Sequence, residues 1–508
     1  MNSQFVQSTG RNHLVLKNFV LKISKTLARS LLVLSLLLTT VLSSYAQSGS
    51  GEDAQPPKQL FLPLVATELG ALSEDDSADY EALLDTPLPE EVNAAAVDTT
   101  FFVTKFTDTN DGACSLIDCS LREALAAAAF NPATHDVIRL PAGTFYLNLG
   151  QLQLVNVSLL GTDANTTLID AQNKSNAIWI SPLIFDGTWS ELVKVTIRNS
   201  VGPGILHEEG ALTLKNVRVQ NSYHEGILSH QMSQADADGV EIYNSIIETN
   251  GHIGVYLEGE AAHIENSVIQ KNKANGIVMH GSAVTIIRAT VTSNDLSGLA
   301  IFYGSTANIQ SSASLFNKGP GVHVYQSTAT IDNSTISGNV SQMHGGGISV
   351  VGASTVALNF VTVVRNTTNA KLDQAADGGG LYVDSQDSAT LHIRNSLVAD
   401  NLDKGGQAHD CAGAIMSEGY NLIEDQVGCL IGGSNVGNIA AGQDPLLGTL
   451  ALNGGKTKNH LPAATSPVVD VIPAAFCEGS AFDQRGITRP RDANGDGSKL
   501  CDIGAIER

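Results

Sequence analysis

The chain has 508 residues, of which 43% are apolar, 5% aromatic and 16% charged, with 48 glycines and a formal net charge of −22. This length exceeds what one compact core accommodates, so the chain must form several domains or an elongated repeat. An excess of acidic residues repels phosphate backbones and anionic lipid, which argues against nucleic acid as a partner.

The first 46 residues have the pattern of a secretion signal. Residues 1–30 contain five basic residues and no acid, and a largely apolar run of 12 residues, 31–42, precedes Ser44 and Ala46. Small residues at these two positions predict cleavage after Ala46. Because a bilayer span needs about 20 residues, we expect no membrane span after cleavage. The mature protein is expected to be secreted or on the surface of a bacterial cell.

Residues 47–98 predict a disordered acidic spacer. They contain 12 acidic residues, one Lys and five Pro, and such a segment buries too little apolar area to offset its ordering entropy. Once the signal (+5) and the spacer (−11) are removed from −22, residues 99–508 still carry −16.

Secretion determines how the six cysteines are interpreted. They lie as three close pairs, which predicts disulfides in an oxidising compartment, although six cysteines allow 15 pairings. The predicted bonds are Cys114–Cys119, Cys411–Cys429 and Cys477–Cys501. No CxxC pair and no Cys-His cluster with zinc spacing occurs, so a zinc site is not expected.

A unit of about 22 residues recurs through the body of the chain. The units begin near Leu192, Leu214, Ile242, Ile264, Ile287, Ile309, Ile331, Leu358 and Ile393. Seven or eight residues into each unit stands an asparagine: Asn199, Asn221, Asn250, Asn272, Asn294, Asn317, Asn339, Asn366 and Asn401. A glycine follows later, at Gly204, Gly226, Gly254, Gly276, Gly298, Gly321, Gly347 and Gly380.

Within each unit the apolar residues alternate with a period of two, which is typical of strands with one face inward. Each unit has room for three short strands and three turns, so the sequence predicts a three-sided parallel β-helix, an all-β solenoid. A leucine-rich repeat has a similar period, but its LxxLxL spacing is absent. We expect Asn and Gly to mark the corners because both adopt the left-handed backbone conformation.

The ends of such a stack need caps, and residues 114–124 predict the first one. Ser120 and Glu123 have the spacing of a capping box ahead of a helix over 121–130, which Asn131 and Pro132 would end. We assign residues 99–160 to this cap and the first coils, 161–425 to the repeats, and 426–508 to a carboxy-terminal segment.

Both ends resemble a known family. CSLREA at 119–124, with DTNDG at 108–112 and DVIRLPAGTFYL at 136–147, is similar to the CSLREA domain that begins secreted bacterial right-handed β-helix proteins. Four further strings resemble the choice-of-anchor Q segment of such proteins: DPLLGTLALNGG at 444–455, SPVVD at 466–470, DQRGITRP at 483–490 and DIGAIE at 502–507. The resemblance implies a right-handed, pectate-lyase-like β-helix in a secreted or envelope setting. It implies no catalytic residue.

One carboxy-terminal loop has part of the D-x-[DN]-x-[DN]-G pattern of a calcium site, in which hard oxygens suit a hard cation. The predicted ligands are Asp492, Asn494, Asp496 and Asp502. The alternative is a polar turn held by a disulfide. A weaker candidate of the same kind comprises Asp108, Asn110 and Asp111. Calcium is the one cofactor that the sequence suggests.

The candidate site follows from the repeat. If the first and third residues after each repeat glycine point inward, the second and fourth form two outward files along one face. The fourth-position file is Glu208, His230, Glu258, His280, Phe302, Tyr325, Val351 and Asp384. The second-position file is Leu206, Leu228, Tyr256, Val278, Ala300, His323, Ser349 and Tyr382. Sugar C–H faces stack on aromatic rings, and sugar hydroxyls form hydrogen bonds with polar side chains. We therefore predict the aromatic residues of these files as ligand-binding residues: Tyr256, Phe302, Tyr325 and Tyr382.

Two functions remain open. The preferred hypothesis is a monomeric, non-catalytic surface β-solenoid for adhesion, display or glycan binding. The alternative is a polysaccharide lyase or glycoside hydrolase, with Glu258, His280, His323 and Asp384 as catalytic candidates. Neither file contains Lys or Arg, which weighs against an anionic polysaccharide. A merely hydrated face, without a ligand, is the simplest alternative to both.

Overall fold

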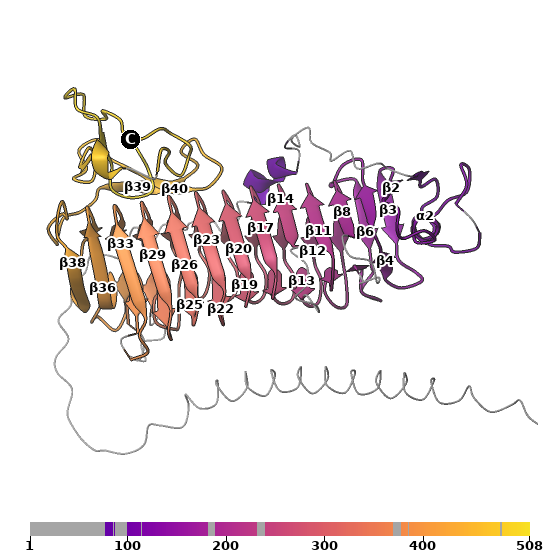
Figure 1. Ribbon diagram of the computed structural model, residues 1–508, viewed down its shortest axis with the longest axis horizontal. Helices are drawn as coiled ribbons and strands as arrows, with labels where there is room; N and C mark the ends of the chain where they lie inside the picture. Colours follow the sequence, from indigo (N-terminus) through magenta and orange to yellow (C-terminus); the bar gives the residue numbers. More distant parts are fainter. Residues whose placement is uncertain are drawn as a thin grey trace, which may run out of the picture. The chain divides into compact units, whose positions relative to one another are not determined.

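The computed structural model describes the chain in nine ranges: 77–84, 86, 99–112, 114–180, 188–230, 239–368, 377–384, 386–477 and 480–508. The predicted signal and most of the spacer lie outside these ranges. Within them, parallel strands stack coil upon coil around an apolar core, which confirms the predicted β-helix (Figure 1). The three predicted disulfides are present.

Three faces make up each coil, and we name them A, B and C. Face A comprises β1 (Thr100–Phe102), β2 (Asp136–Arg139), β5 (Val157–Leu160), β8 (Trp189–Val193), β11 (Ala211–Lys215), β14 (Val240–Tyr243), β17 (Ala261–Glu265), β20 (Ala283–Ile287), β23 (Thr306–Gln310), β26 (Thr328–Asp332), β29 (Thr355–Asn359), β33 (Thr390–Arg394), β36 (Cys411–Gly419) and β38 (Cys429–Ser434). Face B comprises β3 (Gly143–Tyr146), β6 (Thr167–Asp170), β9 (Thr196–Arg198), β12 (Arg218–Gln220), β15 (Ile246–Glu248), β18 (Val268–Gln270), β21 (Thr290–Thr292), β24 (Ala313–Leu315), β27 (Thr335–Ser337), β30 (Thr362–Val364), β34 (Leu397–Ala399) and β37 (Leu422–Ile423). Face C comprises β4 (Leu152–Leu154), β7 (Ile178–Ile180), β10 (Ile205–His207), β13 (Ile227–His230), β16 (Val255–Glu258), β19 (Ile277–His280), β22 (Leu299–Phe302), β25 (Val322–Tyr325), β28 (Ile348–Val351) and β32 (Leu381–Val383). The short pair β31 (Thr367–Thr368) and β35 (Leu402–Asp403) lies outside these faces.

The predicted alternation is confirmed on face C, where the first and third residues of the strands from β16 to β32 are buried in the core. One register assignment is wrong by a residue. Ile264 pairs with Ile286, and Ile287 lies on the outer side of β20. Because Ile286 and Ile287 are both isoleucine, the sequence alone does not distinguish which of them points inward.

The corner asparagines have a different role from the predicted one. Asn199 and Asn221 do adopt a left-handed backbone, but from Asn250 onward the left-handed residue is the one before the asparagine, such as Lys271 (φ 55°) before Asn272. The asparagines themselves are buried in a ladder. From Asn250 to Asn366, each side-chain amide donates to the side-chain oxygen of the asparagine in the next coil, at 2.9–3.0 Å, and the Asn401 amide ends the ladder on Asp410.

The repeat glycines are also explained by contact rather than by a left-handed backbone. None of the eight has a positive φ. At Gly276 a Cβ atom would lie 2.7 Å from the carbonyl oxygen of Gly298 and 2.8 Å from the Asn294 amide nitrogen. Successive coils therefore approach too closely at this corner for any side chain.

The amino-terminal cap is the predicted helix, α2 (Leu121–Ala128), which begins with the predicted capping box of Ser120 and Glu123. Its apolar side belongs to the same core as the first coils. Arg122 forms a bidentate ion pair with Asp108 at 2.7 and 3.1 Å, so this carboxylate of the weaker calcium candidate holds the cap together. Burial alone would raise the pKa of Glu123, but hydrogen bonds from the Ser120 and Asp111 backbones and from Lys105 lower it to about 2.

Part of the predicted disordered spacer is ordered, which corrects that prediction. The 3-10 helix η1 (Ser77–Leu83) lies against face B, where Tyr80 and Leu84 are buried beside Ile246 and Val268. The Asn216 side-chain amide donates to three backbone carbonyls of this segment. Because the segment is short and acidic, its own sequence does not predict burial. The apolar residues that bury it lie far away in the sequence.

The carboxy-terminal module, residues 440–508, packs against face B rather than continuing the stack. Its elements are β39 (Leu447–Ala451), β40 (Asn459–Pro462), β41 (Ile472–Pro473), η2 (Ala474–Phe476) and β42 (Leu500–Cys501). Hydrogen bonds join Gln484 to Thr335 and His460 to Ser337. A second apolar cluster, which includes Phe360, Leu397 and Ile503, seals the contact.

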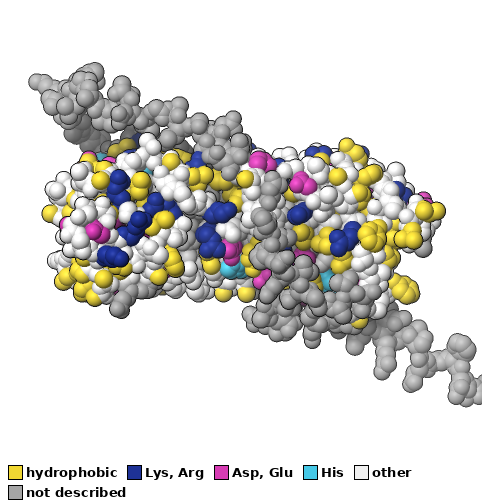
Figure 2. Space-filling view, turned by 90° about the horizontal axis from the view of Figure 1, so that it is seen from above, with side chains coloured by type: hydrophobic (Ala, Val, Ile, Leu, Met, Phe, Trp, Pro, Cys, Tyr) yellow, Lys and Arg dark blue, Asp and Glu magenta, His cyan; other side chains and the backbone are white. Residues whose placement is uncertain are grey.

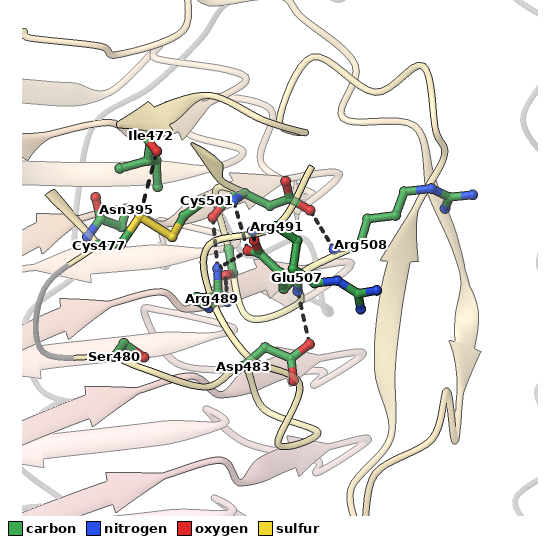
Figure 3. A network of polar contacts seen from close by, with 12 residues as sticks. Asn395, Ile472, Cys477, Ser480, Asp483, Arg489, Arg491, Cys501, Glu507 and Arg508 are labelled. Carbon is green, nitrogen blue, oxygen red and sulfur yellow. Dashed lines mark hydrogen bonds and ion pairs between the residues drawn. A yellow bond between two sulfur atoms is a disulfide. The ribbon is translucent and has the colours of Figure 1, made fainter. Parts of the chain in front are cut away.

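An ionic network forms the centre of this module (Figure 3). Arg489 is fully buried, donates to Glu507 Oε2 at 3.0 Å and to the Gly504 carbonyl at 2.8 Å, and lies 4.1 Å from the Phe360 ring centroid. Asp483 accepts a hydrogen bond from the Glu507 backbone. The DQRGITRP and DIGAIE strings thus have a structural role.

Candidate functional site

The outward side of face C bears the predicted site residues, but it is not uniformly exposed. Val278, Ala300 and Ser349 in the second-position file are buried, and Tyr256, His323 and Tyr382 are half-buried. The fourth-position residues are more open. The second of the two predicted outward files is therefore largely covered, and Val278 and Ala300 belong to an apolar cluster against which Tyr256 and Phe302 pack.

An alternating ladder of carboxylates and imidazoles occupies four consecutive coils. Strand register places Glu208, His230, Glu258 and His280 in one row. The His230–Glu208 and His280–Glu258 pairs each have nitrogen and oxygen atoms 3.9 Å apart. The Trp179 indole donates to the other oxygen of Glu208 at 2.8 Å, whereas Glu258 is 52% exposed and available to a ligand.

An aromatic cluster continues the same face. The rings of Phe302 and His323 are 5.4 Å apart, and those of Tyr303 and Tyr325 are also 5.4 Å apart, both in edge-to-face geometry. His280 joins the cluster at 4.9 Å from Tyr303. Stacked and tilted rings on a strand face present flat apolar area with polar edges, which suits sugar C–H faces and hydroxyls.

Tyr303 was missed by the sequence interpretation. It occupies the corner position that Gly259, Gly281 and Gly352 fill in other coils, and it has the same left-handed backbone (φ 53°). Its side chain is 51% exposed. The available signal was a bulky tyrosine at a position that three other coils give to glycine, because a left-handed backbone is unfavourable for an aromatic residue; Gln326 holds the same position in the next coil.

The four catalytic candidates do not form one site. Glu258 and His280 are adjacent, but His323 lies two coils beyond His280 and Asp384 four coils beyond it, about 19 Å at 4.8 Å per coil. Asp384 accepts a hydrogen bond from the Gln386 backbone. Burial lowers the pKa of His323 to about 4, so its imidazole is neutral at physiological pH.

A separate polar cluster lies inside the core beneath face C. Ser229 Oγ is 2.7 Å from both His207 Nδ1 and Glu260 Oε1, and His207 Nε2 donates to the Gly210 carbonyl at 2.9 Å. With its proton on Nε2, neutral His207 accepts a hydrogen bond at Nδ1 from the Ser229 hydroxyl. That hydroxyl then has no second hydrogen to donate to Glu260. Glu260 must therefore donate to Ser229 as a protonated acid. Burial raises the pKa of Glu260 to about 7 and lowers that of His207 to about 4.

This cluster predicts a pH-dependent effect of Glu260→Gln. A carboxyl whose folded pKa is raised from 4.5 to about 7 stabilises the fold fully below pH 4.5 and loses that contribution as the pH rises through 7. The amide of Gln donates without titrating. We expect the variant to match the parent near pH 5 and to exceed it by roughly 1–2 kcal/mol at pH 8, measured by denaturant unfolding. Glu258→Gln, at the exposed end of the preceding strand β16, serves as the control. Equal pH profiles for all three proteins would contradict a protonated Glu260 that donates to Ser229.

The predicted calcium loop is a hydrogen-bonded turn. Both carboxylate oxygens of Asp492 accept backbone amides, as do the side chains of Asn494 and Asp496. Asp502 is buried and accepts from the backbones of Asp470 and Arg508. Among the described residues, no group of three or more His, Cys, Asp or Glu side chains is placed to hold a metal ion.

Comparison with known proteins supports the fold. The family of right-handed β-helix regions matches residues 231–397 and 275–442. Similar solved structures include the Agl-KA catalytic domain (TM-score 0.48, 16% identity, 69% of each chain) and the pectate lyase Pel9A (0.43, 12%, 81% of this chain and 97% of that one). Another is the A-module of the mannuronan C-5 epimerase AlgE4 of Azotobacter vinelandii (0.41, 16%, 67% and 100%). No curated protein matches the chain.

With TM-scores below 0.5 and identities of 12–16%, these solved structures assign no residue role to this chain. In the described part of the chain, no helix has the length and apolar character of a membrane span.

Proposed function

We propose that this right-handed parallel β-helix is a secreted or cell-surface protein that binds glycans along face C without catalysing their breakdown, in adhesion or surface display. The observation that carries the proposal is the row on face C in which Glu208, His230, Glu258 and His280 lead into the cluster of Phe302, Tyr303 and Tyr325. A glycan chain lying along the stack would meet polar groups and rings at about 4.8 Å intervals.

Substitution of Tyr303 tests this proposal. Tyr303→Ala removes the most exposed ring of the cluster, and we expect binding of an oligosaccharide found on a glycan array to weaken about tenfold, or about 1.4 kcal/mol. Tyr146→Ala is the matched control, because Tyr146 is similarly exposed (47%) but lies on face B. Equal affinities of the two variants, measured by titration calorimetry, would contradict a role of face C.

A carbohydrate-active enzyme is the second candidate, favoured by the pairing of His280 with Glu258 at 3.9 Å. Such a pair could supply a general base. Glu208 and Glu258 are two coils apart, about 9.6 Å, at the upper limit for an inverting glycosidase. New reducing ends or unsaturated uronates from a polysaccharide panel, abolished by Glu258→Gln and His280→Ala, would support the enzyme. Binding without turnover would support the non-catalytic proposal.

We propose that the protein belongs with CSLREA-type secreted proteins that have a choice-of-anchor Q-like segment, because its terminal motifs resemble theirs. The first motif acts in the amino-terminal cap, where Arg122 bonds to Asp108 and Glu123 to the Asp111 backbone, and the second acts within the carboxy-terminal module, where Arg489 bonds to Glu507. We propose that the protein is exported through its amino-terminal signal and acts as a monomer.

We also propose calcium binding at the loop of Asp492, Asn494 and Asp496. After chelation, calcium titration is expected to release or absorb heat in the parent protein and not in Asp492→Asn. That substitution retains one of the two oxygens that accept backbone amides in the turn and removes the negative charge that a hard cation requires. A calorimetric trace without a heat change for the parent protein would contradict calcium binding at this loop.

A further inference from the structure

Carboxylates flank a tyrosine ring near the amino-terminal half of face C. Glu258 stands two residues after Tyr256 on the same side of β16, and Glu225 lies on the adjoining corner. Burial, followed by the negative charges of Glu258 and then Glu225, raises the pKa of the Tyr256 phenol to about 12. Both carboxylates therefore act on this ring, although Glu225 already has a partner in His252 at 2.7 Å.

The same arrangement recurs five coils away. Asp384 stands two residues after Tyr382, and Asp377 precedes the strand. Burial and then the charges of Asp384 and Asp377 raise the pKa of Tyr382. The His344 ring stacks on Tyr382 at 4.1 Å with an interplanar angle of 20°, which fixes the orientation of the tyrosine. A ring flanked by carboxylates attracts a cation through both its face and its neighbours.

Two further features of face C point to a ligand of this charge. The outward files contain no Lys or Arg, and the Lys273 and Lys318 ammonium groups on the corner before face C are paired with Asp295. Lys and Arg side chains instead gather over the carboxy-terminal module, which Figure 2 shows from above.

From these observations we propose that face C selects polysaccharides whose sugars carry free amino groups, such as a polymer of glucosamine. The inference rests on the proposed glycan binding and adds its chemical class. The ammonium groups would lie beside Tyr256 with Glu258 and beside Tyr382 with Asp384, while the sugar rings stack on Tyr303 and Tyr325. The same carboxylates repel uronate polymers.

The histidines of the face set the conditions for the test. His230 and His280 face Glu258 along the row, and His252 faces Glu225, so a cationic ligand shares these carboxylates with neighbouring imidazoles. The measurement belongs at a mildly acidic to neutral pH, where amino sugars carry charge, and at low salt, where exposed charges are weakly screened.

The experiment compares three hexasaccharides on the whole protein by titration calorimetry: β-1,4-linked glucosamine, the same backbone fully N-acetylated, and galacturonate. We expect the free amine to bind about tenfold more tightly than the acetylated oligomer, with the galacturonate weakest. Glu258→Gln and Asp384→Asn should each reduce this preference severalfold, because each removes one negative charge beside a tyrosine of face C. Glu418→Gln removes the same charge from face A and should leave the preference intact.

The outcomes separate the two proposals. If the acetylated and free oligomers bind equally, and Tyr303→Ala weakens both, glycan binding stands and the selectivity is wrong. If the galacturonate binds best, the selectivity is likewise wrong. If Glu418→Gln reduces the preference as much as Glu258→Gln, the attraction is a property of the net charge and not of face C, which also overturns the inference. If no oligosaccharide binds, both proposals fail.

Discussion

Replacing Arg489 with methionine is expected to detach the carboxy-terminal module from face B. The substitution retains the apolar stem of the side chain but leaves Glu507, which is 1% exposed, without its counter-ion. Removing one partner of a buried ion pair costs about 3–5 kcal/mol. That is a large part of the stability of a module this small, which has short strands and one disulfide.

Hydrogen exchange and limited proteolysis would localise this loss. Residues 440–508 of Arg489→Met should lose protection while the coils from β8 to β29 keep theirs. Arg491→Met is the matched control, because its side chain is exposed and only its backbone amide bonds to Glu507. The double variant Arg489→Met with Glu507→Gln should recover part of the loss. Unchanged protection in the single variant would show that the ionic network does not hold the module.

The second large effect is expected from Asn294→Leu, in the middle of the asparagine ladder. Asn294 Oδ1 accepts both the backbone and side-chain amides of Asn272, and its own amide donates to Asn317 and to the Ile269 carbonyl. Leucine fills a similar volume but leaves at least two buried donors unpaired. At about 1–3 kcal/mol for each, the expected cost is roughly 2–6 kcal/mol.

Because coils contact only their neighbours, this loss should divide the stack. We expect two unfolding transitions by calorimetry in place of one, with the break near β19 to β22. Asn308→Leu, which alters an outward amide of the same coil on face A, should leave a single transition and change stability little. A single transition at the parent temperature for Asn294→Leu would show that the ladder contributes no stability.

The β-helix and its disulfides could be predicted because their signals are local or periodic. Alternating apolar residues give the inward side of each strand, and the capping box of Ser120 and Glu123 has a fixed spacing. The roles of Asn272 and Gly276 could not be predicted, since both depend on the neighbouring coil. The residue type shows which positions tolerate a left-handed backbone. It does not show that the next coil needs a hydrogen bond from an asparagine or the absence of a side chain at a glycine.

The candidate site could be predicted only where its residues follow the period of two along a strand. Register alone placed Glu258, His280, Phe302 and Tyr325 in one row, which the strand pairing confirms. Tyr303 lies at a corner and Asp377 before a strand, outside any file, so period-two reasoning could not include them. The docking of η1 and of the carboxy-terminal module on face B depends on contacts across more than a hundred residues, for which the sequence has no repeat.

The helix α2 also determines how copies of this protein can meet. It covers the core at the first coil, whereas the last coil ends in β38, whose outer edge pairs with no further strand among the described residues and where Leu430 is 70% exposed. Polymerisation through strand edges requires two open ends on every molecule. With one end closed by a helix, end-to-end joining stops at a pair, so fibres cannot grow by this route.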